Sequence, residues 1–118
     1  MAITELFAGV AVADFGAMLP WYQRLFGKPP DFFPHEAEAV WRVTDHAWVY
    51  VVAVERSVAE RAGGALLTIL VDDLEDQVAQ LTERGLPIGP INVLPGAARK
   101  VEISDPEGNR ITFAQPLP

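Results

Sequence analysis

Few side chains in this sequence have the types and spacing that acid–base or metal chemistry needs. The chain contains two histidines, His35 and His46, and no cysteine. The lack of cysteine excludes disulfides, thiolate metal sites and a cysteine nucleophile. A site that uses both histidines would need them to converge with a carboxylate across a hairpin, yet both lie in or beside predicted turns. His46 is the best candidate general base, because imidazole titrates near neutrality; a solvated loop histidine is the simpler interpretation.

Glu102 is the second candidate for acid–base chemistry. It lies between Val101 and Ile103, and the alternation of a strand puts its side chain on the opposite face from theirs. That face is either solvent or a cavity, where the carboxylate would act as a base or bind a cation. The sequence has no Gly-x-Ser-x-Gly motif, phosphate-binding loop or dinucleotide fingerprint.

Aromatic side chains gather in two consecutive predicted strands of the first half. Trp41 precedes a turn, and Trp48 and Tyr50 follow it. Alternation places Trp48 and Tyr50 on one face and Val49 and Val51 on the other, which we expect to pack under a helix. An aromatic-lined groove suits flat ligands that are apolar or cationic. Packing in the core or in a dimer interface explains the same pattern.

These residues are positioned by an internal repeat. In each half an apolar strand runs into an aspartate, Asp14 or Asp73, followed by a helix-length segment and a glycine, Gly27 or Gly85. The aspartates are suited to cap a helix N-terminus, and the glycines suit the left-handed residue after a helix. The pattern predicts two copies of one strand–helix unit.

Three extended segments follow each predicted helix, which makes each half a βαβββ module. The helices are expected at Gly16–Phe26, where Pro20 predicts a kink or the true first turn, and at Glu75–Arg84. Arg56–Gly64 is expected to be a linker with about one helical turn. The extended segments are Asp31–Phe33, Ala39–Thr44, Trp48–Glu55, Ile88–Val93, Arg99–Ser104 and Arg110–Gln115.

The turn Asp105-Pro106-Glu107-Gly108-Asn109, followed by Arg110-Ile111-Thr112-Phe113, resembles the closing hairpin of vicinal-oxygen-chelate proteins, the superfamily of glyoxalases, bleomycin resistance proteins and extradiol dioxygenases. Val12-Ala13-Asp14, Trp21–Gly27 and Val71-Asp72-Asp73-Leu74 match the same family in the same order. The resemblance implies an α+β fold in which two βαβββ modules form curled half-barrel sheets with helices on the outer face. We expect one domain with modules at 1–56 and 65–118 joined by a linker at 57–64.

The resemblance also locates the positions where many members hold a metal. They fall on Phe7, Leu66, Thr112 and, within one residue, Tyr50. None is a His, Asp or Glu, so the chain resembles a member that lacks the metal ligands, and we expect no metal and no cofactor. With Trp48, these positions are the candidate ligand-binding residues; core packing is the alternative for Phe7 and Leu66. The resemblance further implies a homodimer, with module pairing either within one chain or swapped between chains.

Charge and hydropathy exclude several partners. Nine Lys and Arg against sixteen Asp and Glu give a net charge of −7, which disfavours nucleic-acid binding. The sequence shows neither a signal peptide nor an apolar run long enough to span a membrane, so we expect a soluble, cytoplasmic protein.

We therefore hypothesise a protein that sequesters an apolar, aromatic or cationic small molecule without metal. The alternative is a metal-independent lyase or isomerase on the same scaffold, with His46 or Glu102 as base. A metal-dependent glyoxalase or dioxygenase would need ligands that the chain lacks, and a purely structural or regulatory role also fits. The sequence leaves the ligand and the existence of any reaction open.

Overall fold

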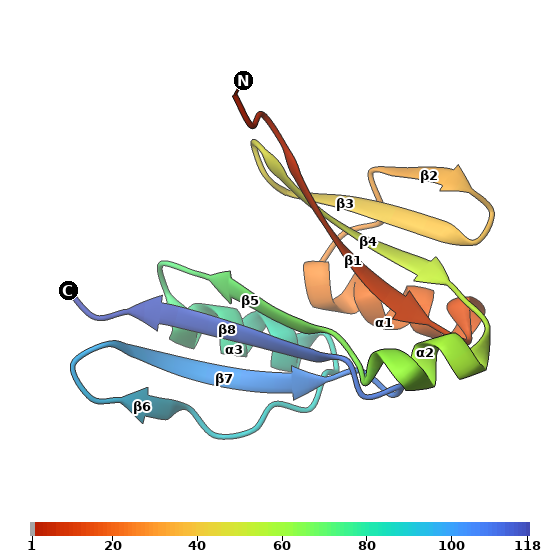
Figure 1. Cartoon of the computed structure of the whole chain (residues 1–118). Coiled ribbons are helices and arrows are strands. Elements are labelled where there is room, and N and C mark those ends of the chain that lie inside the picture. Colours follow the sequence, from red (N-terminus) through yellow and green to blue (C-terminus); the bar gives the residue numbers. More distant parts are fainter. Residues whose placement is uncertain (1) are drawn as a thin grey trace.

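A computed structural model describes residues 2–118, and two four-stranded sheets organise it (Figure 1). The elements are β1 (Leu6–Val12), α1 (Phe15–Phe26), β2 (Phe32–His35), β3 (Glu38–Thr44), β4 (Ala47–Ala53), α2 (Arg56–Ala62), β5 (Leu66–Leu70), α3 (Leu74–Glu83), β6 (Asn92–Leu94), β7 (Ala98–Ser104) and β8 (Arg110–Pro116).

The two sheets have the same topology. Their strand orders are β1-β4-β3-β2 and β5-β8-β7-β6. In each, the first strand pairs in parallel with the last, and the remaining pairs are antiparallel. We call β1–β4 with α1 module one, and β5–β8 with α3 module two. The predicted α+β fold of two βαβββ modules with curled, unclosed sheets is confirmed.

The predicted helix caps also form. The Asp14 carboxylate accepts a hydrogen bond from the Ala17 amide at 3.1 Å, and Asp73 accepts one from Asp76 at 3.0 Å. Gly27 adopts the left-handed conformation, with φ of 72°, at the end of α1. Pro20 lies inside a continuous helix, so the interpretation that the helix begins there is wrong.

Two further expectations need correction. The linker forms a seven-residue helix, α2, rather than about one turn, and its composition of Ala, Arg and Glu favours helix. The strand expected at Ile88–Val93 is only β6, Asn92–Leu94. Pro87 and Pro90 have no amide hydrogen for a sheet ladder, which explains the late start.

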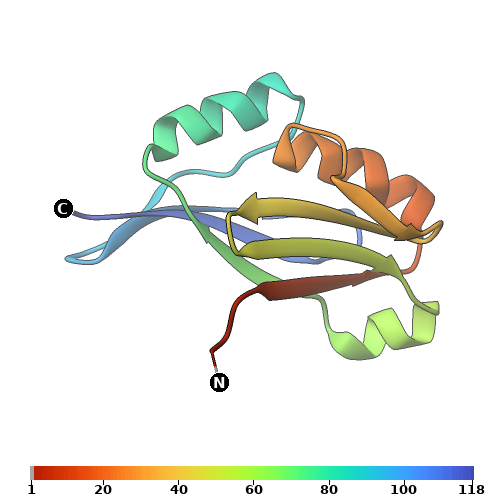
Figure 2. The same cartoon turned by 90° about the horizontal axis from the view of Figure 1, so that it is seen from above.

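The two modules share one hydrophobic core rather than having one each. It includes Tyr22 and Leu25 from α1, Leu81 from α3, and Val51 and Ile111 from the two sheets, all almost fully buried. Figure 2 shows α1 and α3 side by side on the same side of the molecule. In residues 2–118 no helix combines the length and apolarity needed to cross a membrane.

The turn between β7 and β8 joins the modules. Asp105, 3% exposed, accepts a hydrogen bond from the Tyr22 hydroxyl at 2.7 Å and from the amides of Glu107 and Asn109 at 2.8 and 2.9 Å. Burial, and then the Asp105 carboxylate, raise the pKa of Tyr22 far above its usual range, so the hydroxyl remains a donor.

Glu107 completes this connection. Its two carboxylate oxygens accept hydrogen bonds from the amides of Ala13 and Asp14 at 2.7 and 2.9 Å, at the entrance to α1. A carboxylate at this position also complements the positive end of the α1 dipole. A turn in module two therefore holds the start of the helix in module one.

We predict that Glu107→Ala lowers the free energy of unfolding by about 1–3 kcal/mol, because two backbone amides lose a charged acceptor. Urea unfolding followed by circular dichroism measures the change. Glu60→Ala, which removes an exposed carboxylate on α2, is the control and should change stability far less. Equal effects of the two substitutions would contradict the role assigned to Glu107.

Candidate functional site

The first sheet has one face packed against the core and one open face. Val49 and Val51 are buried in the core, whereas Trp48 and Tyr50 point to the opposite face, the arrangement that alternation predicts. Phe7 pairs with Trp48, and Val40 pairs with both Tyr50 and Phe32, so all four strands of the sheet contribute to this face. We call it the aromatic face; its members are Phe7, Phe32, Val40, Trp48 and Tyr50.

Trp48 lies at the centre of the aromatic face and is held by several contacts. Its ring stacks on Phe7 with centroids 5.5 Å apart and planes inclined by 5°, and Phe32 approaches it edge-on at 6.0 Å. The guanidinium of Arg42 lies 5.3 Å from the Trp48 ring centroid. The indole N–H donates to the Glu5 carboxylate at 3.1 Å. These contacts orient a large aromatic surface that is not part of the core.

Gly9 lets the Tyr50 ring lie directly on β1. A Cβ atom at Gly9 would fall 2.4 Å from Cζ of Tyr50, so any other residue at position 9 would require the Tyr50 ring to move. Phe7 and Phe32 are 49% and 44% exposed, so the aromatic face is open to solvent. An open, ordered aromatic surface of this kind can stack against a flat molecule.

The second sheet also has an open face, and it is more polar. Thr112 pairs with Thr68 on one side and with Glu102 on the other, so the three side chains share this face. Lys100 forms an ion pair with Glu102 at 3.5 Å. Leu66, also on this face, is 75% exposed. We call this the polar face; its members are Leu66, Thr68, Lys100, Glu102 and Thr112.

The five candidate ligand-binding residues therefore divide between two sheets. Phe7, Trp48 and Tyr50 lie on the aromatic face, and Leu66 and Thr112 lie on the polar face. Glu102, the candidate base, lies beside Thr112. Neither face is closed within the single chain, because both Phe7 and Leu66 are exposed.

The two histidines do not converge. His35 and His46 lie beyond opposite ends of β3, which separates them by the length of a seven-residue strand. Nε2 of His35 lies 3.2 Å from Glu38, and Nδ1 of His46 lies 3.6 Å from Glu5. The two histidines therefore do not form one site. Among residues 2–118, no group of three or more His, Asp or Glu side chains is placed to hold a metal ion.

His46 nevertheless lies near the edge of the aromatic face, since the Glu5 carboxylate contacts both His46 and the Trp48 indole. The sequence did not indicate Glu5, Gly9 or Arg42 as members or neighbours of this face, and Phe32 was not among the candidate ligand-binding residues. The strand register could have identified Arg42 and Gly9, because they pair with Trp48 and Tyr50. The indole–carboxylate contact of Glu5 has no signal in the sequence.

The chain is similar to known proteins over almost its whole length. The family model described as the Glyoxalase/Bleomycin resistance protein/Dioxygenase superfamily matches residues 6–113. A glyoxalase / bleomycin resistance protein from Catenulispora acidiphila DSM 44928 is 41% identical, with a TM-score of 0.84 over 97% of this chain and 98% of that one. No curated protein matches.

More distant solved structures share the fold. A bleomycin-binding protein complexed with bleomycin is 16% identical, with a TM-score of 0.72 over 98% of each chain. A lactoylglutathione lyase from Agrobacterium tumefaciens is 13% identical, with a TM-score of 0.75 over 98% of this chain and 95% of that one. The chain has the repeated βαβββ topology and the Asp105–Asn109 turn, and the family model matches residues 6–113. It therefore belongs to the Glyoxalase/Bleomycin resistance protein/Dioxygenase superfamily.

Proposed function

We propose that this protein binds a flat aromatic small molecule on the aromatic face and sequesters it without a metal. The observation that carries the proposal is the exposed stack of Phe7 on Trp48, with Phe32 edge-on beside it. Ordered aromatic rings that remain open to solvent are expected at ligand sites or interfaces, because burying them is favourable. The 16% identical bleomycin-binding protein shows that a chain of this fold can hold an organic molecule.

The electrostatics of the aromatic face favour a neutral or cationic ligand. The Trp48 ring already has one cation, Arg42, within cation–π distance, and a ligand cation can use the same kind of contact. Glu5 and Glu38 contribute carboxylates near this face. The net charge of −7 adds a long-range attraction for cations.

The residue types at the expected metal positions support a metal-free site. Phe7 and Leu66 have hydrocarbon side chains, and Thr112 offers one hydroxyl, which is a poor ligand for a divalent ion. A metal-independent lyase or isomerase is the second candidate. It is supported by Glu102, whose carboxylate is paired with Lys100 on the open polar face.

We further propose a homodimer in which a second copy covers the open faces. Exposed side chains such as Phe7, Leu66 and Leu70 leave apolar surface on the open faces that a second copy would bury. Closed two-fold pairing is the commonest way to bury such a surface.

The dimer predicts a mass of about twice the 12.9 kDa chain at micromolar concentration. Light scattering coupled to size-exclusion chromatography measures it. Leu66→Glu, which places a charge on the polar face, should shift the protein toward monomer, whereas Glu60→Lys on α2 should not. A wild-type monomer across this range would refute the dimer.

The ligand site predicts that planar aromatic cations and neutral planar aromatics quench tryptophan fluorescence and raise the melting temperature. Trp48→Ala should weaken binding of the best such ligand by about 1–3 kcal/mol, because it removes the central ring. Gly9→Ala should also weaken it, since the added methyl group must displace Tyr50. Fluorescence titration of protein dialysed against EDTA measures both effects and tests metal independence.

Phe33→Ala is the matched control for Phe32→Ala. Both residues are exposed phenylalanines on β2, but only Phe32 contacts Trp48 in the aromatic face. Binding that is lost equally in the two variants, or that requires added metal, would contradict the proposed site.

A further inference from the structure

A cleft of about 390 Å³ lies where the modules meet, apart from the proposed ligand site. Its walls come from the end of α1 and from β3, β5 and α3. One lining residue, Arg42, also contacts Trp48. The volume falls in the range of roughly 300–1,000 Å³ typical of small-molecule pockets. Its apolar lining consists of Leu25, Phe26, Val43, Ile69, Leu70, Val71 and Phe113.

The polar lining of the cleft carries positive charge. It includes Lys28, Arg42 and Arg84, together with Gln77 and Gln80, and no Asp or Glu. Two cationic side chains, Lys28 and Arg84, thus meet in one cleft of a protein whose net charge is −7. Arg42 presents its carbonyl to Lys28, because its guanidinium lies over Trp48 on the aromatic face. Positive side chains gathered in one cleft of an acidic protein indicate a binding role, because the negative net charge already keeps the protein soluble.

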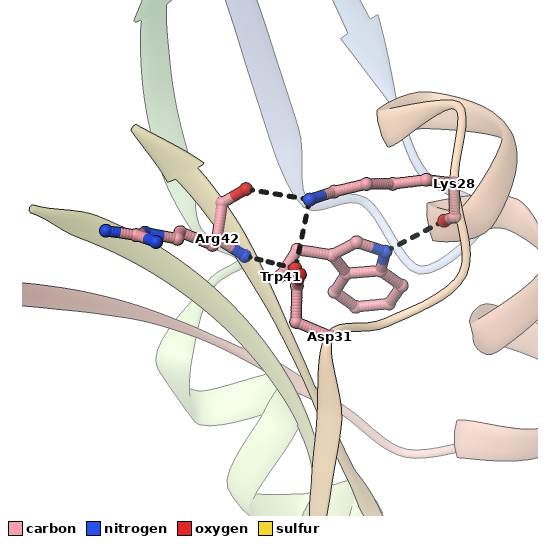
Figure 3. A network of polar contacts seen from close by, with 4 residues as sticks. All are labelled: Lys28, Asp31, Trp41 and Arg42. Atoms are coloured by element: carbon pink, nitrogen blue, oxygen red, sulfur yellow. Dashed lines mark hydrogen bonds and ion pairs between the residues drawn. The ribbon is translucent and has the colours of Figure 1, made fainter. Parts of the chain in front are cut away.

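Lys28 is held at the cleft by a network of polar contacts (Figure 3). Its ammonium donates to the Asp31 carboxylate at 3.0 Å and to the Arg42 carbonyl at 3.1 Å. The Trp41 indole donates to the Lys28 carbonyl at 3.0 Å. The Arg42 amide, and then Lys28, hold the pKa of Asp31 below its usual range, so this carboxylate offsets one positive charge.

Arg42 and Arg84 keep their charge, and Arg84 keeps two of its five N–H donors. Arg42 uses one of its five N–H groups, toward the Asp45 carbonyl at 2.7 Å. Arg84 donates to the carbonyls of Arg24 and Leu25 at the end of α1 and to Gln80. Within residues 2–118, neither guanidinium forms an ion pair with a carboxylate.

We propose that this cleft is a second binding site, for a small amphipathic carboxylate. The carboxylate accepts hydrogen bonds from the remaining N–H groups of Arg84 and interacts with Lys28, and a short apolar chain lies on Leu25, Ile69 and Phe113. A monoanion fits better than a phosphate dianion, because the overall charge of −7 repels a second negative charge.

Isothermal titration calorimetry with octanoate tests the site, with octylammonium and 1-octanol as ligands of equal chain length. Octanoate should bind, and the two analogues should bind at least about tenfold more weakly, the effect of losing a charge-assisted hydrogen bond. Lys28→Gln should weaken octanoate binding by a similar factor. Arg61→Gln removes one cation from α2, outside the cleft, and should leave binding unchanged.

Two further variants separate this cleft from the aromatic face. Gln77→Trp fills the cleft from α3 and should abolish octanoate binding, whereas Trp48→Ala should leave it intact. Thermal melts establish that each variant is folded, and Lys28→Gln decides the result if Gln77→Trp does not fold. The proposal is overturned if octanoate gives no heat at millimolar concentration, if the analogues bind equally well, or if Trp48→Ala rather than Lys28→Gln weakens binding.

Discussion

The structure depends on the contact between the Asp105–Asn109 turn and the start of α1. Each module alone has a sheet with one helix, and neither buries its apolar face without the other. The charge of the buried Asp105 is satisfied by four donors: the Tyr22 hydroxyl, two backbone amides of its own turn and the Asn109 side-chain amide. Glu107 then accepts the amides that open α1. Glu107 and the start of α1, which are 93 residues apart in the sequence, are thereby held next to each other.

This contact joins the two modules at one end of their interface, the seam, and Arg84 joins them at a second place. Arg84 ends α3 and donates to the last carbonyls of α1, where helices otherwise leave acceptors unsatisfied. Between these polar contacts the core residues of both modules interlock. The basic cleft lies along this seam, so its shape depends on how the two modules pack.

Using the helix-covered faces for the shared core leaves the other face of each sheet open. On the first sheet this face carries Phe7, Trp48 and Tyr50, and on the second it carries Leu66, Glu102 and Thr112. The proposed dimer and the proposed ligand site are two consequences of this one fact, since both bury the open faces. One scaffold can carry many activities, so the side chains on these faces, rather than the fold, would decide which ligand the proposed site binds.

The sequence by itself determined the features whose causes are local. Asp14 and Asp73 cap their helices through amides three residues away, and alternation along β4 separates Val49 and Val51 from Trp48 and Tyr50. Only the tertiary structure decided that Arg42 lies over Trp48, that Glu5 reaches the indole, and that His35 and His46 lie beyond opposite ends of β3. The division of Phe7 and Leu66 between two open faces is likewise tertiary. These contacts depend on strand register, turn length and module packing, which arise from the whole chain, whereas capping and alternation arise within a few residues.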